Sequence, residues 1–284
     1  MDSTSSEKEG ASMKIYASST LFWGHSFEHI CQQVKSANLA GIEIWVEQLQ
    51  FQQWTIEEIQ YFLNSYQLEA TIHANSWDLN LCSLNAGIRK QSLREIEASI
   101  HIAKQLEVPS ITVHPGKRTV NNRFGEIHER LMISTLQQLQ ELSLEYGVNI
   151  SLELMEPVRK EMYCTSQKMN ELLAHCNDSI TTTFDVAHIP QHLSIVDELK
   201  TLKRIDKIHI SDSTKSTYHV PLGKGELLLD ANLWETIDAL GVPVVLEGLD
   251  SSDSHDFFYD HLDYLQTPLL HLLRSCIHEF FSNQ

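Results

Sequence analysis

Short apolar runs alternate with amphipathic stretches along most of the chain, and this alternation occurs eight times. The apolar runs have the length and composition of buried strands; they cover residues 14–20, 41–46, 70–74, 110–116, 149–155, 180–186, 206–212 and 243–248. Apolar side chains at helical spacing follow each run, over residues 25–38, 55–66, 93–107, 124–146, 165–176, 194–203, 231–240 and 257–274. Eight alternating β and α segments are typical of an all-parallel sheet, and eight strands close a TIM barrel.

An open, doubly wound sheet is the alternative fold for such a pattern. Sheets of that kind usually have fewer strands and carry a Gly-rich phosphate-binding turn after the first strand. The corresponding turn here, SSTLFWGHS, contains one glycine and lacks that fingerprint. We therefore predict an α/β protein with a (β/α)8 TIM barrel as a single domain over residues 13–284. Residues 1–12 are polar and small, and we expect them to form a disordered N-terminal tail.

The composition and the net charge restrict the partners and the cellular compartment that we expect for this chain. A chain of 284 residues is long enough for one large domain, and it contains no run of 18 apolar residues that would span a membrane. The five cysteines are scattered without a CxxC pair, and the first residues lack the apolar segment of a signal peptide. We therefore expect free thiols and a cytoplasmic location. The net charge of −17 makes nucleic acid an unfavourable partner.

Ionisable side chains stand at the ends of six successive predicted strands. They are His73, His114, Glu153, Asp185 with His188 just beyond it, His209 and Glu247, and the loop after the seventh strand adds His219. In a TIM barrel these strand ends form the active-site face. Buried carboxylates cost several kcal/mol unless they are paired or bind a metal. A set of nitrogen and oxygen ligands without thiolates suits Mn, Zn, Co or Mg, so we predict a divalent-metal site.

Several of these residues also have simpler interpretations when they are taken singly. His73 alone could be a hydrogen-bonded core histidine, and Asp185 could cap the following helix. Asp212, between two serines, is typical of a turn or cap. We expect Trp45 and Trp77 to be packing residues and not platforms for a substrate.

The basic and glycine-rich positions give weaker signals. Gly223 and Gly225, in the segment HVPLGKGEL, permit a tight loop over the barrel mouth, and a plain turn is favoured over a phosphate site. Lys117, Arg118 and Arg159 could hold a phosphate, although we favour their interpretation as surface charges.

The order of strand-end motifs resembles that of the xylose isomerase-like TIM barrels, a superfamily of sugar isomerases and epimerases that also includes endonuclease IV-type enzymes. The motifs are VHPG, LELME, FDVAH, KIHISDS, HVPLGKGEL and VVLEG, and the resemblance extends from Met13 over nearly the whole chain. In the isomerase and epimerase branch, the resemblance implies one divalent metal held by Glu153, Asp185, His209 and Glu247. It also implies that the two glutamates are catalytic and exchange a proton on opposite faces of the substrate, which His188 would contact.

In the endonuclease IV branch, three zinc ions share nine ligands. The resemblance implies eight of them here, namely His73, His114, Glu153, Asp185, His188, His209, His219 and Glu247. The ninth position, two residues before His219, is Thr217 in this chain. Threonine is a poor substitute for an anionic ligand, so this chain departs from the pattern at the third metal.

Two enzyme functions therefore remain open from the sequence. The first is a divalent-metal-dependent isomerase or epimerase of a sugar or sugar phosphate, which transfers a proton through a metal-stabilised enediolate. The alternative is a multi-zinc phosphodiesterase of endonuclease IV-like type that acts on a small phosphodiester. A non-catalytic barrel with a structural metal is a third option. The acidic surface and Thr217 favour the first function, with a small molecule as partner; the oligomeric state stays open, a homo-oligomer included.

Overall fold

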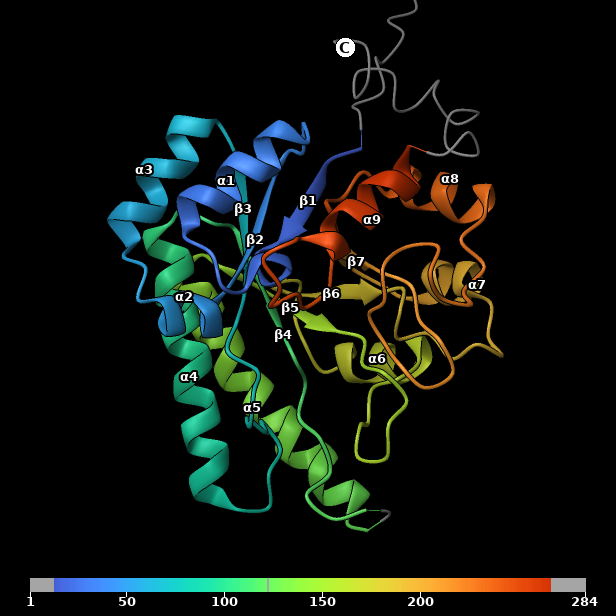
Figure 1. Ribbon diagram of the computed structural model, residues 1–284. Coiled ribbons are helices and arrows are strands. Elements are labelled where there is room, and N and C mark those ends of the chain that lie inside the picture. The colour runs from blue at the N-terminus through green and yellow to red at the C-terminus, as the bar shows by residue number, and fades with distance from the viewer. Residues whose placement is uncertain (1–12, 122, 267–284) are drawn as a thin grey trace, which may run out of the picture.

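The computed structural model describes residues 13–121 and 123–266, so the predicted tail lies outside the described residues. Eight parallel strands follow one another around a closed barrel, and β1 pairs with β8 to complete it (Figure 1). The strands are β1 (Ile15–Ser18), β2 (Gly41–Trp45), β3 (Glu69–His73), β4 (Ser110–Val113), β5 (Asn149–Glu153), β6 (Ile180–Asp185), β7 (Ile205–Ile210) and β8 (Val244–Leu246). The predicted (β/α)8 TIM barrel is confirmed.

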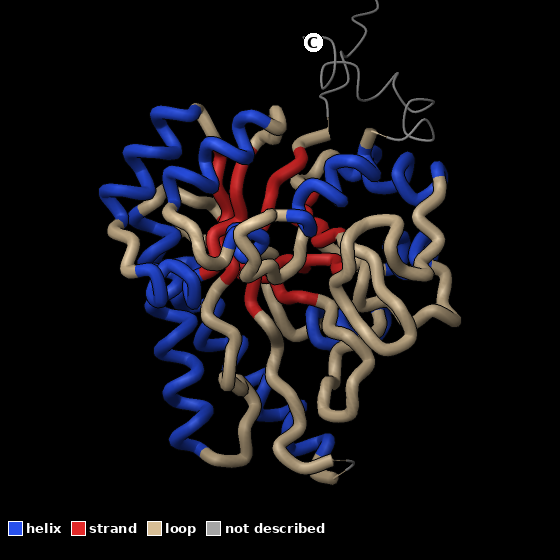
Figure 2. The backbone as a smooth tube through the Cα atoms, in the orientation of Figure 1, coloured by secondary structure: helices blue, strands red, loops and turns tan. Residues whose placement is uncertain are grey.

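Helices surround the strands on the outside of the barrel (Figure 2). They are η1 (Ser19–Phe22), α1 (Phe27–Ser36), α2 (Val46–Gln52), α3 (Ile56–Tyr66), α4 (Ala86–Gln105), α5 (Gly125–Tyr146), α6 (Ser166–Leu173), α7 (Ile195–Thr201), α8 (Ala231–Leu240) and α9 (Asp256–Leu265). Side chains cap several of them: Ser26, Thr55 and Ser194 each accept a hydrogen bond from the backbone N–H three residues later. Among the described residues, no helix is long and apolar enough to cross a membrane.

Two helices differ from the sequence prediction. Helix α4 begins seven residues before the predicted start, because the Asn85 side chain accepts hydrogen bonds from the N–H groups of Gly87 and Ile88. Helix α2 was not predicted, since it follows β2 directly and no turn residue separates the two elements. The last predicted helix, 257–274, is observed as α9, and its predicted end lies outside the described residues.

The interior of the barrel beneath the strand ends contains buried polar side chains. Lys207 is buried inside it, and its Nζ donates to Oε1 of Glu43 at 2.8 Å and to Oγ1 of Thr112 at 2.7 Å. Ser151 and Thr183 share a hydrogen bond of 2.7 Å on the neighbouring strands. The pairing of Lys207 with Glu43 compensates much of the cost of burying two charges. It also places a fixed carboxylate directly below the strand ends.

Candidate metal centre

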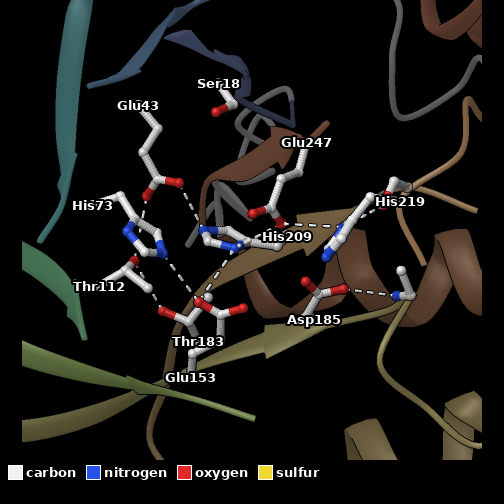
Figure 3. A network of polar contacts seen from close by, with 12 residues as sticks. Ser18, Glu43, His73, Thr112, Glu153, Thr183, Asp185, His209, His219 and Glu247 are labelled. Carbon is white, nitrogen blue, oxygen red and sulfur yellow. Dashed lines mark hydrogen bonds and ion pairs between the residues drawn. The ribbon is translucent and has the colours of Figure 1, made fainter. Parts of the chain in front are cut away.

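Four side chains converge at the carboxyl ends of β5 to β8. Glu153 ends β5, Asp185 ends β6, His209 lies on β7 and Glu247 directly follows β8. All four are buried, and one ligand atom from each lies within 4.8 Å of the others. In Figure 3, Glu153 and Glu247 enter from opposite sides of the His209 ring, with Asp185 beside them. The four residues that the resemblance implied as metal ligands therefore lie together.

The unpaired atoms of this quartet fit a divalent cation. Oδ2 of Asp185, Nδ1 of His209 and Oε2 of Glu247 are buried without a well-directed hydrogen bond. Nδ1 of His209 lies only 3.0 Å from Oε2 of Glu247. The other oxygen of Asp185 accepts the N–H of Ala187 at 2.7 Å, which orients the carboxylate. A cation shared between these buried polar atoms would satisfy them together.

The three carboxylates of the quartet differ in their electrostatic surroundings. Burial raises the pKa of Asp185 well above its usual range, and the charges of Glu247 and Glu153 raise it further. Burial acts in the same direction on the other two carboxylates, but nearby histidines outweigh it. They hold the pKa of Glu153 well below its usual range and lower that of Glu247 to about 2. A bound cation would favour the ionised form of Asp185.

Glu153 also belongs to a second cluster, with His73 and His114. Its Oε2 lies 3.3 Å from Nε2 of His73 and 3.2 Å from Nε2 of His114. Nδ1 of His73 faces the carbonyl oxygen of Ala74 at 3.0 Å and must donate to it, which leaves Nε2 as a lone pair directed at the carboxylate. Its ring stacks on Trp45 at 3.7 Å between centroids, which confirms the packing role of this tryptophan. A lone pair facing a carboxylate needs a proton or a metal between them.

The third cluster comprises Asp185, His188 and His219. Nδ1 of His188 donates to the carbonyl oxygen of Leu154 at 2.8 Å, and its Nε2 lies 3.0 Å from Nε2 of His219. Burial lowers the pKa of His188, but Asp185 and Glu153 outweigh it and raise the value to about 9. Thr217 occupies the position of the anionic ligand in the endonuclease IV pattern. It is exposed in its loop and supplies no carboxylate oxygen to the cluster.

Glu43 is a site residue that the sequence did not reveal. It lies in the middle of β2, and its Oε2 is 2.8 Å from Nε2 of His209 (Figure 3). This contact directs Nδ1 of the same ring toward the other ligands. A carboxylate behind a ligating histidine fixes the tautomer and increases the basicity of the ligand. The only signal in the sequence is a charged residue inside an apolar run, and it does not identify the partner.

A cavity of about 300 Å³ opens above the quartet. Its lining includes Trp77, Glu156, Tyr218, Gly248 and Leu249, in addition to the strand-end residues. Trp77 packs against Trp23, at 5.2 Å between ring centroids, and it is also 51% exposed and forms part of the cavity wall. Glu156 was not singled out from the sequence either, although it falls in the motif LELME.

Lysine and arginine are absent from the described lining of this cavity. Lys117, Arg118 and Arg159 do not line it, in agreement with their interpretation as surface charges. The guanidinium of Arg118 donates instead to the carbonyl oxygen of Glu161 at 3.2 Å. The described lining therefore presents aromatic, acidic and imidazole groups and lacks the guanidinium and ammonium groups that commonly bind phosphate.

Asp212 organises the loop beside the cavity. Its Oδ1 accepts from the N–H groups of Ser213 and Leu227, and its Oδ2 accepts from those of Gly223 and Gly225, at 2.8–3.1 Å. A Cβ atom at Gly225 would collide with this carboxylate, so only glycine fits there. The interpretation of Asp212 as a turn residue is confirmed, and the glycines serve the turn.

Comparison with known sequences supports the fold. A family model described as a xylose isomerase-like TIM barrel matches residues 31–265. Uncharacterized protein MJ1311 of Methanocaldococcus jannaschii is 26% identical over 226 residues, which cover 76% of this chain and 76% of that protein. A protein of Natronomonas pharaonis named probable endonuclease 4 is 23% identical over 174 residues, or 55% of this chain and 60% of its own length.

Solved structures with the same fold include several proteins named as sugar epimerases. A D-tagatose 3-epimerase-like protein superposes with a TM-score of 0.77 at 22% identity, over 92% of this chain and 100% of that chain. An L-ribulose 3-epimerase gives a TM-score of 0.77 at 14% identity, over 96% and 99% of the two chains. At these identities the similarity establishes the shared fold.

Proposed function

We propose that this chain, which belongs to the xylose isomerase-like TIM barrel family, is a divalent-metal-dependent isomerase or epimerase of an unphosphorylated sugar. The observation that carries the proposal is the buried quartet of Glu153, Asp185, His209 and Glu247 at the base of a small cavity. Mn, Co, Zn and Mg are the candidate ions for this nitrogen and oxygen ligand set.

A divalent ion in this quartet would supply Lewis-acid polarisation of a carbonyl and a neighbouring hydroxyl. Glu153 and Glu247 approach the centre from opposite sides. Their lowered pKa values keep both deprotonated near neutral pH, as a general base requires. One carboxylate would remove the proton from the carbon beside the carbonyl, and the other would return a proton to the opposite face or to the neighbouring carbon.

The walls of the cavity support a neutral polyol as the substrate. Trp77 and Tyr218 offer aromatic surface for the apolar face of a sugar ring, and Glu156 and His188 offer polar contacts to hydroxyls. A phosphate group would meet carboxylates and no lysine or arginine among the described lining residues. The sugar epimerases among the structural neighbours, such as the L-ribulose 3-epimerase, agree with this substrate class.

A phosphodiesterase with two metals is the second candidate, favoured by one specific observation. Glu153 is shared between the quartet and the cluster with His73 and His114, which is the arrangement of a carboxylate that bridges two metal ions. Two-metal sites promote phosphodiester hydrolysis. The relative named probable endonuclease 4 agrees with this chemistry. Thr217 weakens a third metal position but leaves the first two intact.

A substrate screen separates the two candidates. The protein is loaded with Mn²⁺, Co²⁺ or Zn²⁺ and incubated with free ketoses, with their phosphate esters and with bis(p-nitrophenyl) phosphate. We expect chromatography to show a new epimer or isomer from a free ketose, lost on chelation and in Glu247→Gln. Release of p-nitrophenol without any sugar conversion would favour the second candidate.

A further inference from the structure

Three histidines outside the barrel mouth form a cluster that the proposed chemistry does not use. His25 precedes α1, His29 lies in its first turn and His255 precedes α9. One ring nitrogen from each lies within 4.8 Å of the others. Nε2 of His29 is 3.1 Å from Nε2 of His255, and the His25 ring lies 4.3 Å from that of His255 between centroids.

We propose that His25, His29 and His255 form a separate metal site that binds a borderline-soft divalent ion, Zn²⁺ above all. Tetrahedral zinc with Zn–N bonds of about 2.0–2.1 Å holds its nitrogen ligands roughly 3.3 Å apart. The separation of 3.1 Å between His29 and His255 is close to this value. An all-imidazole set favours Zn²⁺, Ni²⁺ or Cu²⁺ over Mg²⁺ and Mn²⁺, which prefer oxygen ligands.

Hydrogen bonding alone does not satisfy the cluster. A hydrogen bond between His29 and His255 uses the Nε2 of both rings, one as donor and the other as acceptor. Nε2 of His25 is then buried without any partner. A metal ion would accept a lone pair from each ring and leave none of these nitrogens unsatisfied.

The electrostatic surroundings of His29 suit a metal ligand. Burial lowers the pKa of His29, and the neighbouring His25 and His255 lower it further. Neutral imidazole is the form that coordinates a metal.

The position of the site indicates a structural role. Its ligands join the segment after β1 to the segment after β8, which are already connected by hydrogen bonds from Trp23 N–H to the carbonyl of Asp250 and from Thr20 Oγ1 to that of Gly248. Thr20 and Gly248 also line the cavity. Bound zinc would therefore cross-link the first and last β/α units of the barrel and stabilise one wall of the cavity.

Metal counting on the full chain tests this site without any assay of activity. The protein is saturated with Zn²⁺ or, separately, with Mn²⁺, desalted, and its metal content is measured by mass spectrometry. We expect His29→Gln and His25→Gln each to lose about one zinc per chain while Mn²⁺ content is unchanged, because Mn²⁺ enters only the carboxylate-rich centre. Glu153→Gln should lose metal from the centre and keep the zinc of the three histidines.

His175→Gln is the matched control, since this histidine is exposed beyond the end of α6 and belongs to none of the described clusters. Circular dichroism establishes that each variant is folded. The proposal is overturned if folded His29→Gln and His25→Gln retain the zinc content of the wild type. An equal loss of Zn²⁺ and Mn²⁺ in these variants would also contradict it, because it would show damage to the centre itself.

Discussion

Backbone carbonyls fix the protons of several histidines in the barrel mouth. Nδ1 of His73 donates to Ala74, and Nδ1 of His188 donates to Leu154. In both residues this directs Nε2 into the mouth. His209 is held from the opposite side by a carboxylate, which directs its Nδ1 toward the quartet. Each ring is therefore oriented before any metal arrives, which reduces the reorganisation that binding requires. Neighbouring carboxylates raise the pKa of His188 and of His209, so a metal that bound these rings would displace protons from them.

Substitution of Glu43 tests the support behind the centre. Glu43→Gln keeps an acceptor near His209 but loses the charge, so we expect Mn²⁺ or Zn²⁺ affinity to fall by about 10–100-fold in calorimetric titrations. The loss also leaves Lys207 buried without its counter-charge, and the free energy of unfolding should fall by about 3 kcal/mol. Glu69→Gln, at the opposite end of the barrel, is the control. An unchanged metal affinity in Glu43→Gln would show that the contact with His209 does not support the centre.

Among the elements, the loop that follows β7 depends on a single carboxylate. Asp212→Asn replaces an acceptor oxygen with an NH2 group, so two of the four backbone N–H groups lose their partner. Each buried unpaired N–H costs about 1–3 kcal/mol, and we expect the free energy of unfolding to fall by about 2 kcal/mol or more. The freed loop should also be cut faster by trypsin at Lys215 and Lys224, which are exposed. Asp178→Asn, at a fully exposed aspartate, is the control and should show neither effect. Equal rates of cleavage in the two variants would count against this role of Asp212.

Helix α9 contributes a pH-dependent anchor for the same loop. Nδ1 of His261 accepts the N–H of Leu222, and Nε2 donates to the carbonyl of Glu247. Burial lowers the pKa of His261 to about 4. The unfolded chain, with an ordinary pKa near 6.5, binds the proton more readily, so stability is full above pH 6.5 and is lost as the pH falls toward 4. A pKa difference of about 2.5 corresponds to about 3 kcal/mol.

Urea denaturation of wild type and His261→Gln between pH 7.5 and 4.5 measures this contribution. We expect the wild type to lose stability relative to the variant as the pH falls through this range, because glutamine does not titrate. A stability difference between the two proteins that is independent of pH would exclude His261 as the titrating group.

The elements of the barrel were predictable because each strand is a separate apolar run with its own flanking turns. The gathering of ionisable side chains at one face was predictable for the same reason, since parallel strands bring all their carboxyl ends together. The choice of the quartet among them came from the resemblance to the xylose isomerase-like barrels. Glu43 was not, because its partner His209 is distant in sequence and only barrel closure brings them together. The exposure of Trp77 and the early start of α4 depend on loop conformation and on a local cap at Asn85, which apolar periodicity does not report.

In the whole molecule, the acidic net charge and the acidic cavity both disfavour the binding of anions. A net charge of −17 repels a polyanion at long range, and the described cavity lining offers no lysine or arginine at short range. Both features support the unphosphorylated substrate that we propose. The polar interior of the barrel, with Lys207 and Glu43 at the centre, holds the strands that position the quartet.

Duplex DNA with an abasic site should not bind the protein at moderate salt. Association with DNA relies on neutralising phosphates with Lys and Arg, and the charge balance here opposes it. We expect fluorescence anisotropy of a labelled duplex to stay constant up to about 10 μM protein in 0.1 M salt, a concentration that lies within the range of typical non-specific dissociation constants. Saturable binding that weakens with added salt would contradict this prediction and support a nucleic-acid substrate.

Exchange of a carbon-bound proton is the most direct measurement of the proposed chemistry. Protein loaded with Mn²⁺ or Co²⁺ is incubated with a free ketose in D₂O, and NMR follows deuterium at the carbon beside the carbonyl. We predict incorporation at that carbon that requires the metal and that is lost in Glu153→Gln or Glu247→Gln, since these carboxylates exchange the proton with solvent. No incorporation from any free ketose by the fully metal-loaded protein, with hydrolysis of a phosphodiester by the same preparation, would contradict the account.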